Sequence, residues 1–262
     1  MRFETIDLEQ QGAVATLRFN RPAHYNALSL QMSQELLQAA LHLRANATVR
    51  ALVITGTGKA FHAGGDIKAF LEEGDGVADY VRRALTNFHA FLIELHRAPW
   101  PVITAVNGVA AGAGFSLALA GDLCMASEEA GFTVAYSRIG ASPDGGMSHF
   151  LTRAIGPRRA YALYLSNRVL TAREALDWGI VHEVVPAAEL SERAAQLAAS
   201  LADGPTLAYS RAKELIHQAL DHSLETQLTR EAERIVASSR SEYFREGIQA
   251  FVEKRPAHFR GR

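Results

Sequence analysis

At residues 107–122 the chain reads Asn-Gly-Val-Ala-Ala-Gly-Ala-Gly-Phe-Ser-Leu-Ala-Leu-Ala-Gly-Asp, and at residues 59–68 it reads Lys-Ala-Phe-His-Ala-Gly-Gly-Asp-Ile-Lys. Each stretch follows an apolar run typical of a strand, Pro101–Val106 and Ala51–Thr55 respectively, and leads into a run typical of a helix. Glycine allows backbone N–H groups to approach a ligand without an intervening Cβ. The first N–H groups of a helix also lack partners within it. The sequence therefore predicts two glycine turns that together bind one developing oxyanion.

The composition is that of a globular protein and argues against several kinds of partner and metal site. The 262 residues are 48% hydrophobic and 21% charged, which is typical of one large globular domain or of a core with an appendage. A net charge of −1 argues against a nucleic acid or a membrane surface as the partner. The only cysteine, Cys124, excludes an intramolecular disulfide and fits a reducing, cytoplasmic location. The ten histidines show no metal-ligand spacing, so we expect no metal.

One apolar stretch, Val102–Gly121, is long enough to imitate a membrane span. The turn signal Asn107-Gly108 interrupts it, and glycine is frequent within it. We therefore expect a buried strand, a loop and a short core helix there instead.

The pattern along the first part of the chain indicates an α/β core. Alternating residues predict that a strand at Ala13–Phe19 pairs with one at Phe3–Leu8. Ser29 is a good N-cap for a helix at Leu30–Arg44. An acidic, glycine-containing segment at residues 72–79 predicts an exposed loop, and a helix is expected at Asp79–Arg97. Strand, glycine turn and helix then recur, as in α/β proteins.

The pattern changes after residue 186. Amphipathic helices are predicted in the remaining part, at Glu189–Ala202, Pro205–Leu220, Ser223–Ser238 and Glu242–Glu253. No strand is predicted there for these helices to cover. We therefore expect residues 187–262 to pack on a neighbouring subunit or back on their own core.

Four motifs together resemble the crotonase superfamily, the enoyl-CoA hydratases and isomerases. They occur in the order and at the spacing of that family, over essentially the whole chain: Arg21–Leu28, Phe61–Lys68, Asn107–Gly114 and Ala172–Val181. Three further stretches resemble its phenylacetate-pathway enoyl-CoA isomerase branch: Ala135–Gly146, Thr226–Glu231 and Tyr243–Phe251.

This resemblance implies a fold and a substrate class. The fold is a spiral of ββα turns over residues 1–186, followed by a helical trimerisation region over residues 187–262. Trimers, often paired into hexamers, would bind acyl-CoA thioesters, with coenzyme A as part of the substrate and no separate cofactor. By position, the two oxyanion donors fall on the N–H groups of Gly65 and Ala113. Ala113 replaces a glycine common in the family, but the donor is backbone and is retained.

The nearby acids would decide the reaction. Hydratases of the family carry glutamates at the positions that Ser116 and Tyr136 occupy here, and neutral hydroxyls are poor bases near pH 7. Asp144 matches the single acid/base of some family isomerases. One carboxylate suits the transfer of a proton between two carbons, which converts a 3-enoyl thioester to a 2-enoyl thioester. Alternatively, Asp144 merely caps a helix that begins at Met147.

Other chemistry stays open on the sequence alone. His89 matches, by spacing, the water-activating histidine of the aryl-CoA dehalogenase branch, in which Asp144 would be the nucleophile; it is otherwise a helix residue beside an apolar stripe. The chain could also be a hydratase that uses Asp144 alone, a non-catalytic or RNA-binding relative, or a scaffold.

Further residues are candidates for contact with the acyl-CoA. By position they are Ala63, Gly65, Asp66, Ile67, Lys68, Ala113, Tyr136 and Lys254. Asp66 also suits the N-cap of a helix from Ile67, and Lys68 could meet a phosphate of coenzyme A. His62 is expected to pack locally or to face solvent. The segment Phe70–Phe91 is expected to line the acyl pocket, with Phe88 and Phe91 suggesting room for a ring or an apolar chain.

Overall fold

The structure is a computed structural model that describes residues 2–259. Its strands are β1 (Ile6–Gln11), β2 (Val14–Phe19), β3 (Ala51–Gly56), β4 (Ala60–His62), β5 (Val102–Val106), β6 (Val109–Ala111), β7 (Leu123–Ser127), β8 (Gly131–Thr133), β9 (Leu170–Thr171) and β10 (Glu183–Val185). Its α-helices are α1 (Leu30–Ala45), α2 (Ile67–Glu73), α3 (Val77–His96), α4 (Ala113–Ala120), α5 (Met147–Ser166), α6 (Ala172–Asp177), α7 (Leu190–Asp203), α8 (Thr206–Gln218), α9 (Leu224–Ser239) and α10 (Glu242–Glu253).

The strands form two sheets. The larger has the order β1-β2-β3-β5-β7-β10, in which only the β1–β2 pair is antiparallel. The smaller has the order β4-β6-β8-β9, in which β4, β6 and β8 are parallel. Along the chain a strand of the large sheet, a strand of the small sheet and a helix follow one another three times, from β3, from β5 and from β7. This is the spiral of ββα turns that the motifs predicted.

Both faces of the large sheet are covered. The main core contains fully buried phenylalanines, among them Phe61, Phe88 and Phe115, and it includes the inner faces of α1, α3 and α4. A second apolar cluster lies between the opposite face of β3, β5 and β7 and the alanine-rich side of α7. Parallel strands buried on both faces read as continuous apolar runs, which explains why Ala51–Gly56 is buried throughout.

The apolar stretch Val102–Gly121 folds as β5, β6 and α4, so the expectation of a strand, a loop and a core helix is confirmed. Within residues 2–259 no helix is both long and apolar enough to cross a membrane.

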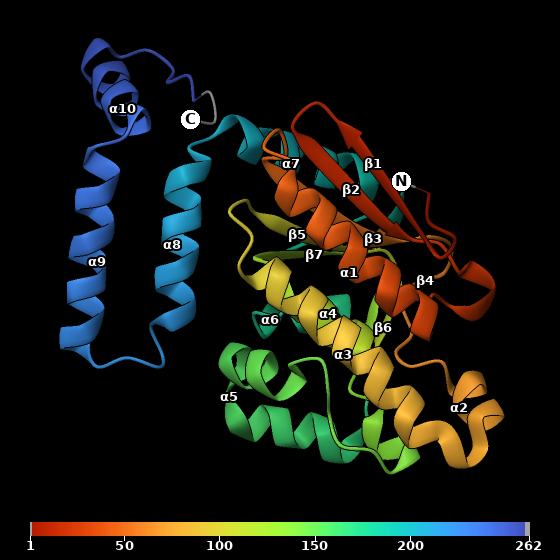
Figure 1. Ribbon diagram of the computed structural model, residues 1–262. Coiled ribbons are helices and arrows are strands. Elements are labelled where there is room, and N and C mark those ends of the chain that lie inside the picture. Colours follow the sequence, from red (N-terminus) through yellow and green to blue (C-terminus); the bar gives the residue numbers. More distant parts are fainter. Residues whose placement is uncertain (1, 260–262) are drawn as a thin grey trace.

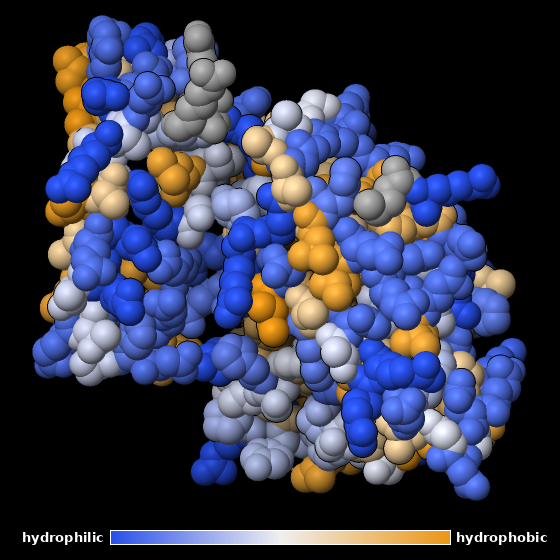
Figure 2. Space-filling model, in the orientation of Figure 1, coloured by the Kyte–Doolittle hydropathy of each residue, from blue (hydrophilic) through white to orange (hydrophobic). Residues whose placement is uncertain are grey.

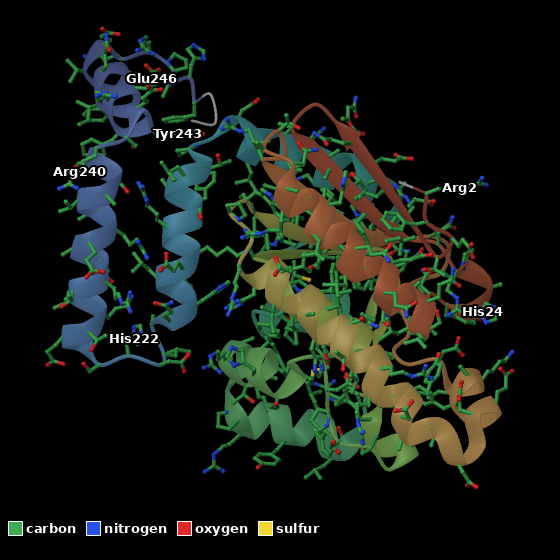
Figure 3. All side chains as sticks on the ribbon, in the orientation of Figure 1. Arg2, His24, His222, Arg240, Tyr243 and Glu246 are labelled. Atoms are coloured by element: carbon green, nitrogen blue, oxygen red, sulfur yellow. The ribbon has the colours of Figure 1, made fainter. Side chains whose placement is uncertain are left out.

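Helices α8, α9 and α10 form an arm beside this core, which we call the C-terminal arm (Figure 1). In Figure 1, α9 lies on the side of α8 that faces away from the core, and none of its residues is buried. Figure 2 shows hydrophobic side chains along the outer edge of the arm. Tyr243 lies where α10 turns back toward α8 (Figure 3), and its hydroxyl meets the Thr206 hydroxyl at 3.2 Å.

Two expectations from the sequence are wrong. The segment at residues 72–79 is exposed but is not a loop, since only the 3-10 turn Gly74–Gly76 separates α2 from α3. Its acidic side chains lie on the exposed side of helical turns, where they stay hydrated and destabilise the fold little. The tail was also expected to have no strand to cover, whereas α7 covers the large sheet and so packs back on the core, which was one of the two arrangements expected for residues 187–262. The helices that extend from the core are therefore α8, α9 and α10.

Candidate active site

The carboxyl ends of three neighbouring parallel strands bring the candidate residues together. In the small sheet His62 of β4 pairs with Ala110 of β6, so that Gly65 and Ala113 each lie three residues beyond a paired position. Strand β8 is the next strand, and Tyr136 lies three residues beyond its end. Ligands of parallel α/β sheets bind at this edge. The topology thus places both predicted oxyanion donors and Tyr136 at one edge of the sheet.

The two glycine turns are in backbone contact. Gly64 has φ +94°, and a Cβ there would lie 3.0 Å from the carbonyl oxygen of Ala111, so the close approach requires glycine. The N–H of Gly65 and the N–H of Ala113 have no hydrogen-bond partner among residues 2–259. Ala113 is the first residue of α4, where such a free donor is expected. Two backbone N–H donors without partners in the described part of the chain, on two turns in contact, are the kind of group that an oxyanion hole uses.

His62 stabilises the glycine turn that contains Gly64 and Gly65. Its side chain is fully buried, and its Nδ1 accepts a hydrogen bond from the N–H of Gly64 at 3.1 Å. Burial lowers the pKa of His62 to about 3, so the imidazole is neutral near pH 7. The expectation that His62 packs locally is correct, and a solvent-facing His62 is excluded. This role could not be predicted from the sequence, because a polar residue in a short strand does not reveal which side is buried.

Asp144 is hydrogen-bonded to the two hydroxyl residues that replace the glutamates of hydratases. The Tyr136 hydroxyl donates to Asp144 Oδ1 at 2.7 Å. Ser116 Oγ donates to the main-chain oxygen of Asp144 at 2.9 Å and lies 3.2 Å from the Tyr136 hydroxyl. This contact between Tyr136 and Asp144 was not predicted from the sequence. The sequence did contain an indication of it, since the two glutamate positions are occupied by Ser116 and Tyr136 while a carboxylate, Asp144, lies close by in the chain.

The turn that carries Asp144 requires glycine at position 145. Gly145 has φ +57°, and a Cβ there would lie 2.9 Å from the Phe88 ring and 3.0 Å from Ser116. Helix α5 is preceded by Gly146, without a side-chain cap. The alternative in which Asp144 caps that helix is therefore wrong, since its carboxylate is bound by Tyr136 instead.

Three influences act on the pKa of Asp144. Burial raises it, whereas the hydrogen bond from Tyr136 and the nearby charge of His89 lower it, and the net effect is a raised pKa. A raised pKa brings a carboxylate closer to the range in which it can both take and return a proton.

His89 lies beside the same turn. It projects from α3, its side chain is exposed, and its Nε2 accepts a hydrogen bond from the N–H of Gly145 at 3.3 Å. The structure therefore brings His89 next to Asp144, as the spacing suggested, with the histidine holding the backbone of the turn. Phe88 and Phe91 are fully buried in the core, so their rings do not form an open wall for an acyl group.

The remaining candidates lie around the first turn and on the arm. Asp66 accepts from the N–H of Ala69 at 3.3 Å as the N-cap of α2, and pairs with Arg21 at 2.9 Å. Ala63 is half-buried, while Ile67 and Lys68 are exposed at the start of α2. Lys254 is exposed at the end of α10, which lies at the opposite end of the molecule from α2 (Figure 1). Within one subunit Lys254 is therefore not brought to the glycine turns.

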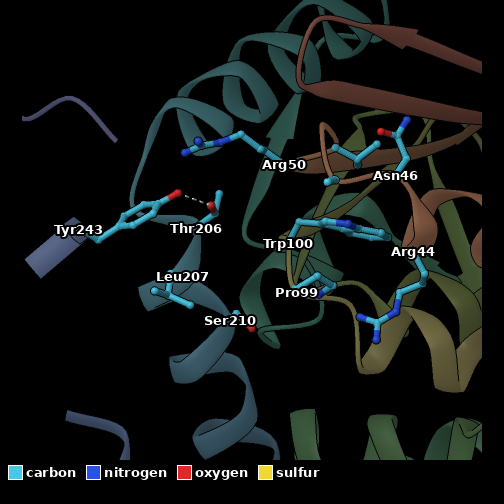
Figure 4. Close-up of a pocket in the computed structure, with 11 residues that line it drawn as sticks. Arg44, Asn46, Arg50, Pro99, Trp100, Thr206, Leu207, Ser210 and Tyr243 are labelled. Carbon is cyan, nitrogen blue, oxygen red and sulfur yellow. Dashed lines mark hydrogen bonds between the residues drawn. The ribbon is translucent and has the colours of Figure 1, made fainter. Parts of the chain in front are cut away.

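Cavities also occur away from these turns. One of about 230 Å³ lies where the arm meets the core, with Trp100 and Arg50 on one side and Thr206 and Tyr243 on the other (Figure 4). A second, of about 480 Å³, lies behind the Asp144 turn between Pro143 and α5 and is lined mostly by apolar residues. Among the described residues no group of three or more His, Cys, Asp or Glu side chains is arranged to hold a metal ion.

Comparisons with known proteins show which family the chain resembles. The family model described as enoyl-CoA hydratase/isomerase matches residues 9–262. A probable enoyl-CoA hydratase of Rhodobacter capsulatus is 40% identical over the full length of both chains. The 1,2-epoxyphenylacetyl-CoA isomerase of Escherichia coli is 38% identical over 95% of each chain. A 4-chlorobenzoyl coenzyme A dehalogenase of Arthrobacter is 34% identical over 95% of this chain and 91% of its own.

Solved structures agree as well. A crystal structure described as an enoyl-CoA hydratase subunit of Geobacillus kaustophilus superimposes with a TM-score of 0.91 at 36% identity, over 99% of both chains.

Proposed function

The chain belongs to the enoyl-CoA hydratase/isomerase family, as its four motifs predicted, and we propose that it converts 3-enoyl-CoA thioesters to 2-enoyl-CoA thioesters with Asp144 as the single acid/base. The thioester oxygen would accept hydrogen bonds from the N–H groups of Gly65 and Ala113, which stabilise the enolate formed when a proton leaves C2. Asp144 would take that proton and return it to C4.

One observation carries the choice of isomerisation. At the two positions where family hydratases carry glutamates, this chain has Ser116 and Tyr136, and both bind Asp144. No second carboxylate is therefore available there to orient a water molecule for addition. A lone carboxylate beside two free N–H donors is sufficient for a proton transfer between carbons.

The similarity to 1,2-epoxyphenylacetyl-CoA isomerase supports an acyl group that contains a ring. We include in the proposal that this chain acts on cyclic or aryl-derived acyl-CoAs, as in phenylacetate breakdown, and that Lys68 and a Lys254 from a neighbouring subunit contact the coenzyme A. We also propose that the protein assembles as a homotrimer or a hexamer and is located in the cytoplasm.

A second candidate is hydrolytic dehalogenation, favoured by the position of His89 beside Asp144 and by the similarity to a dehalogenase. In that reaction Asp144 would attack an aryl carbon and His89 would activate water. One observation speaks against it. His89 Nε2 already accepts a hydrogen bond from the N–H of Gly145, so this nitrogen is not free to activate water.

Substituting Asp144→Asn tests the proposal. The amide cannot take a proton from carbon, so turnover of a panel of aliphatic and cyclic 3-enoyl-CoAs should fall by about 10²–10⁴. Asp203→Asn, at the exposed end of α7, is the matched control and should keep wild-type turnover. Wild-type turnover in Asp144→Asn would contradict the proposal. Chloride release from 4-chlorobenzoyl-CoA without double-bond migration would favour dehalogenation, and hydration alone would favour a hydratase.

A further inference from the structure

Tyr136 makes the shortest hydrogen bond to the candidate acid/base. Its hydroxyl donates to Asp144 Oδ1 at 2.7 Å, and no hydrogen bond to Oδ2 is found within residues 2–259. Building on the function proposed above, we propose that Tyr136 is a positioning residue that fixes Asp144 by Oδ1 and leaves Oδ2 to carry the proton between the two carbons of the substrate.

The same tyrosine also lies beside the oxyanion turn. Its side chain is only 7% exposed, and a Cβ built on Gly112 would lie 3.8 Å from Tyr136 Cζ. Gly112 directly precedes Ala113, one of the two oxyanion donors. Ser116 adds a second link, because its Oγ lies 3.3 Å from the carbonyl oxygen of Gly112 and 2.9 Å from that of Asp144. The buried ring therefore acts as a rigid spacer between the hole and the carboxylate.

The proton balance of the step agrees with this role. Oδ2 takes the proton from C2, and the electron pair of the broken C–H bond forms the enolate. The same proton then leaves Oδ2 for C4 while the C2–C3 double bond forms, so that the carboxylate is regenerated. Tyr136 keeps its own proton throughout, because burial and the adjacent Asp144 raise the pKa of its hydroxyl. Its donated hydrogen bond favours the ionised form of Asp144.

Tyr136→Phe removes this hydrogen bond and retains the ring. We expect kcat to fall about ten- to a hundredfold with little change in KM, in keeping with the loss of a hydrogen bond to a charged group. The acid limb of the profile of kcat/KM against pH should move to higher pH, since the carboxylate loses a donor. Tyr243→Phe, which removes the hydroxyl of an equally buried tyrosine that contacts Thr206 where the arm meets the core, is the matched control and should leave that limb in place.

A titration without substrate separates this proposal from the proposed function. The ¹³C signal of the Asp144 carboxyl, assigned with Asp144→Asn, should titrate at higher pH in Tyr136→Phe than in the wild type. Replacing tyrosine by 3-fluorotyrosine, a stronger donor, should lower the midpoint and covers the case in which Tyr136→Phe does not fold. Unchanged midpoints would overturn the role of Tyr136. Shifted midpoints in an enzyme that moves no double bond would overturn the isomerase function instead.

Discussion

Ala113 offers a way to test the oxyanion hole one residue at a time, because the group that acts is its main-chain N–H. Ala113 is the first residue of α4, a position that accepts proline because its N–H has no partner in the helix. Ala113→Pro should therefore remove the donor and leave the helix in place. We expect the rate of double-bond migration to fall by about 10²–10³.

The control for this prediction is Ala113→Gly, which restores the residue common in the family and keeps the N–H. It should retain turnover close to that of the wild type. Circular dichroism and the melting temperature would show whether both variants fold. Turnover in a folded Ala113→Pro equal to that of Ala113→Gly would mean that this N–H does not bind the thioester oxygen.

At the residue scale, the sequence revealed the parts of the site that depend on local backbone. The two glycine turns were predicted because each follows a strand, and the resemblance to the crotonase superfamily assigned the donors within them to Gly65 and Ala113. The hydrogen bond from Tyr136 to Asp144 could not be predicted, because the chain from Tyr136 to Asp144 passes through a 3-10 turn (Tyr136–Ile139) and the left-handed Gly140, each of which redirects the chain. The burial of His62 was hidden for a related reason, since it is decided by the packing of Phe19 and Phe88 around its ring.

At the scale of elements, most helices were predicted within a few residues because their caps are local. Ser29, Ser223 and Ser241 each accept a hydrogen bond from a backbone N–H in the first turn of the helix that follows. The segment at residues 72–79 was misread because its glycines and acids are typical of loops. There the junction of α2 and α3 is set by tertiary contacts, among them the edge-on packing of Phe70 against Tyr80.

The contact between α8 and the core predicts a dependence of stability on pH. His217 of α8 stacks on His96 of α3, with ring centroids 3.8 Å apart, and its Nε2 lies 3.8 Å from Asp122 Oδ1. Lys213, from the same helix, pairs with Asp122 at 2.8 Å, and His149 of α5 lies close enough for its charge to act on His217. Burial and these neighbouring cations lower the pKa of His217 to about 4.

The sign of the effect follows from linkage. Between about pH 6.5 and pH 4 the unfolded chain binds a proton at His217 that the folded chain does not, so the free energy of unfolding should fall as the pH falls through this window. His217→Phe keeps an aromatic ring for the stack and removes the titration. Urea unfolding at pH 7 and at pH 5 should show a smaller loss for His217→Phe than for the wild type. His42→Phe, at an exposed position of α1, should lose as much as the wild type, and an equal loss in all three proteins would contradict the argument.

At the scale of the whole molecule, the C-terminal arm exposes more apolar surface than a separate chain would be expected to keep in water. On α9 the exposed residues include Leu224 at 69% and Ile235 at 59%, and on α10 Phe251 is 85% exposed. The arm that carries these side chains extends from the core and contacts it mainly through α8 (Figure 1). The sequence predicted the helices and their apolar faces, and in the described part of the single chain these faces are uncovered.

We therefore predict that the arm is covered by neighbouring copies of the chain and that Phe251→Asp weakens this assembly. Placing a charge where an aromatic ring is buried between subunits removes apolar burial and adds a desolvation cost. Light scattering should give a mass of three or six chains for the wild type and a shift toward one chain, at micromolar concentration, for Phe251→Asp. Gln249→Asp adds the same charge to an exposed polar position of the same helix and should leave the mass unchanged. A wild type that is monomeric, or a Phe251→Asp variant that stays assembled, would show that the apolar face of α10 has another purpose.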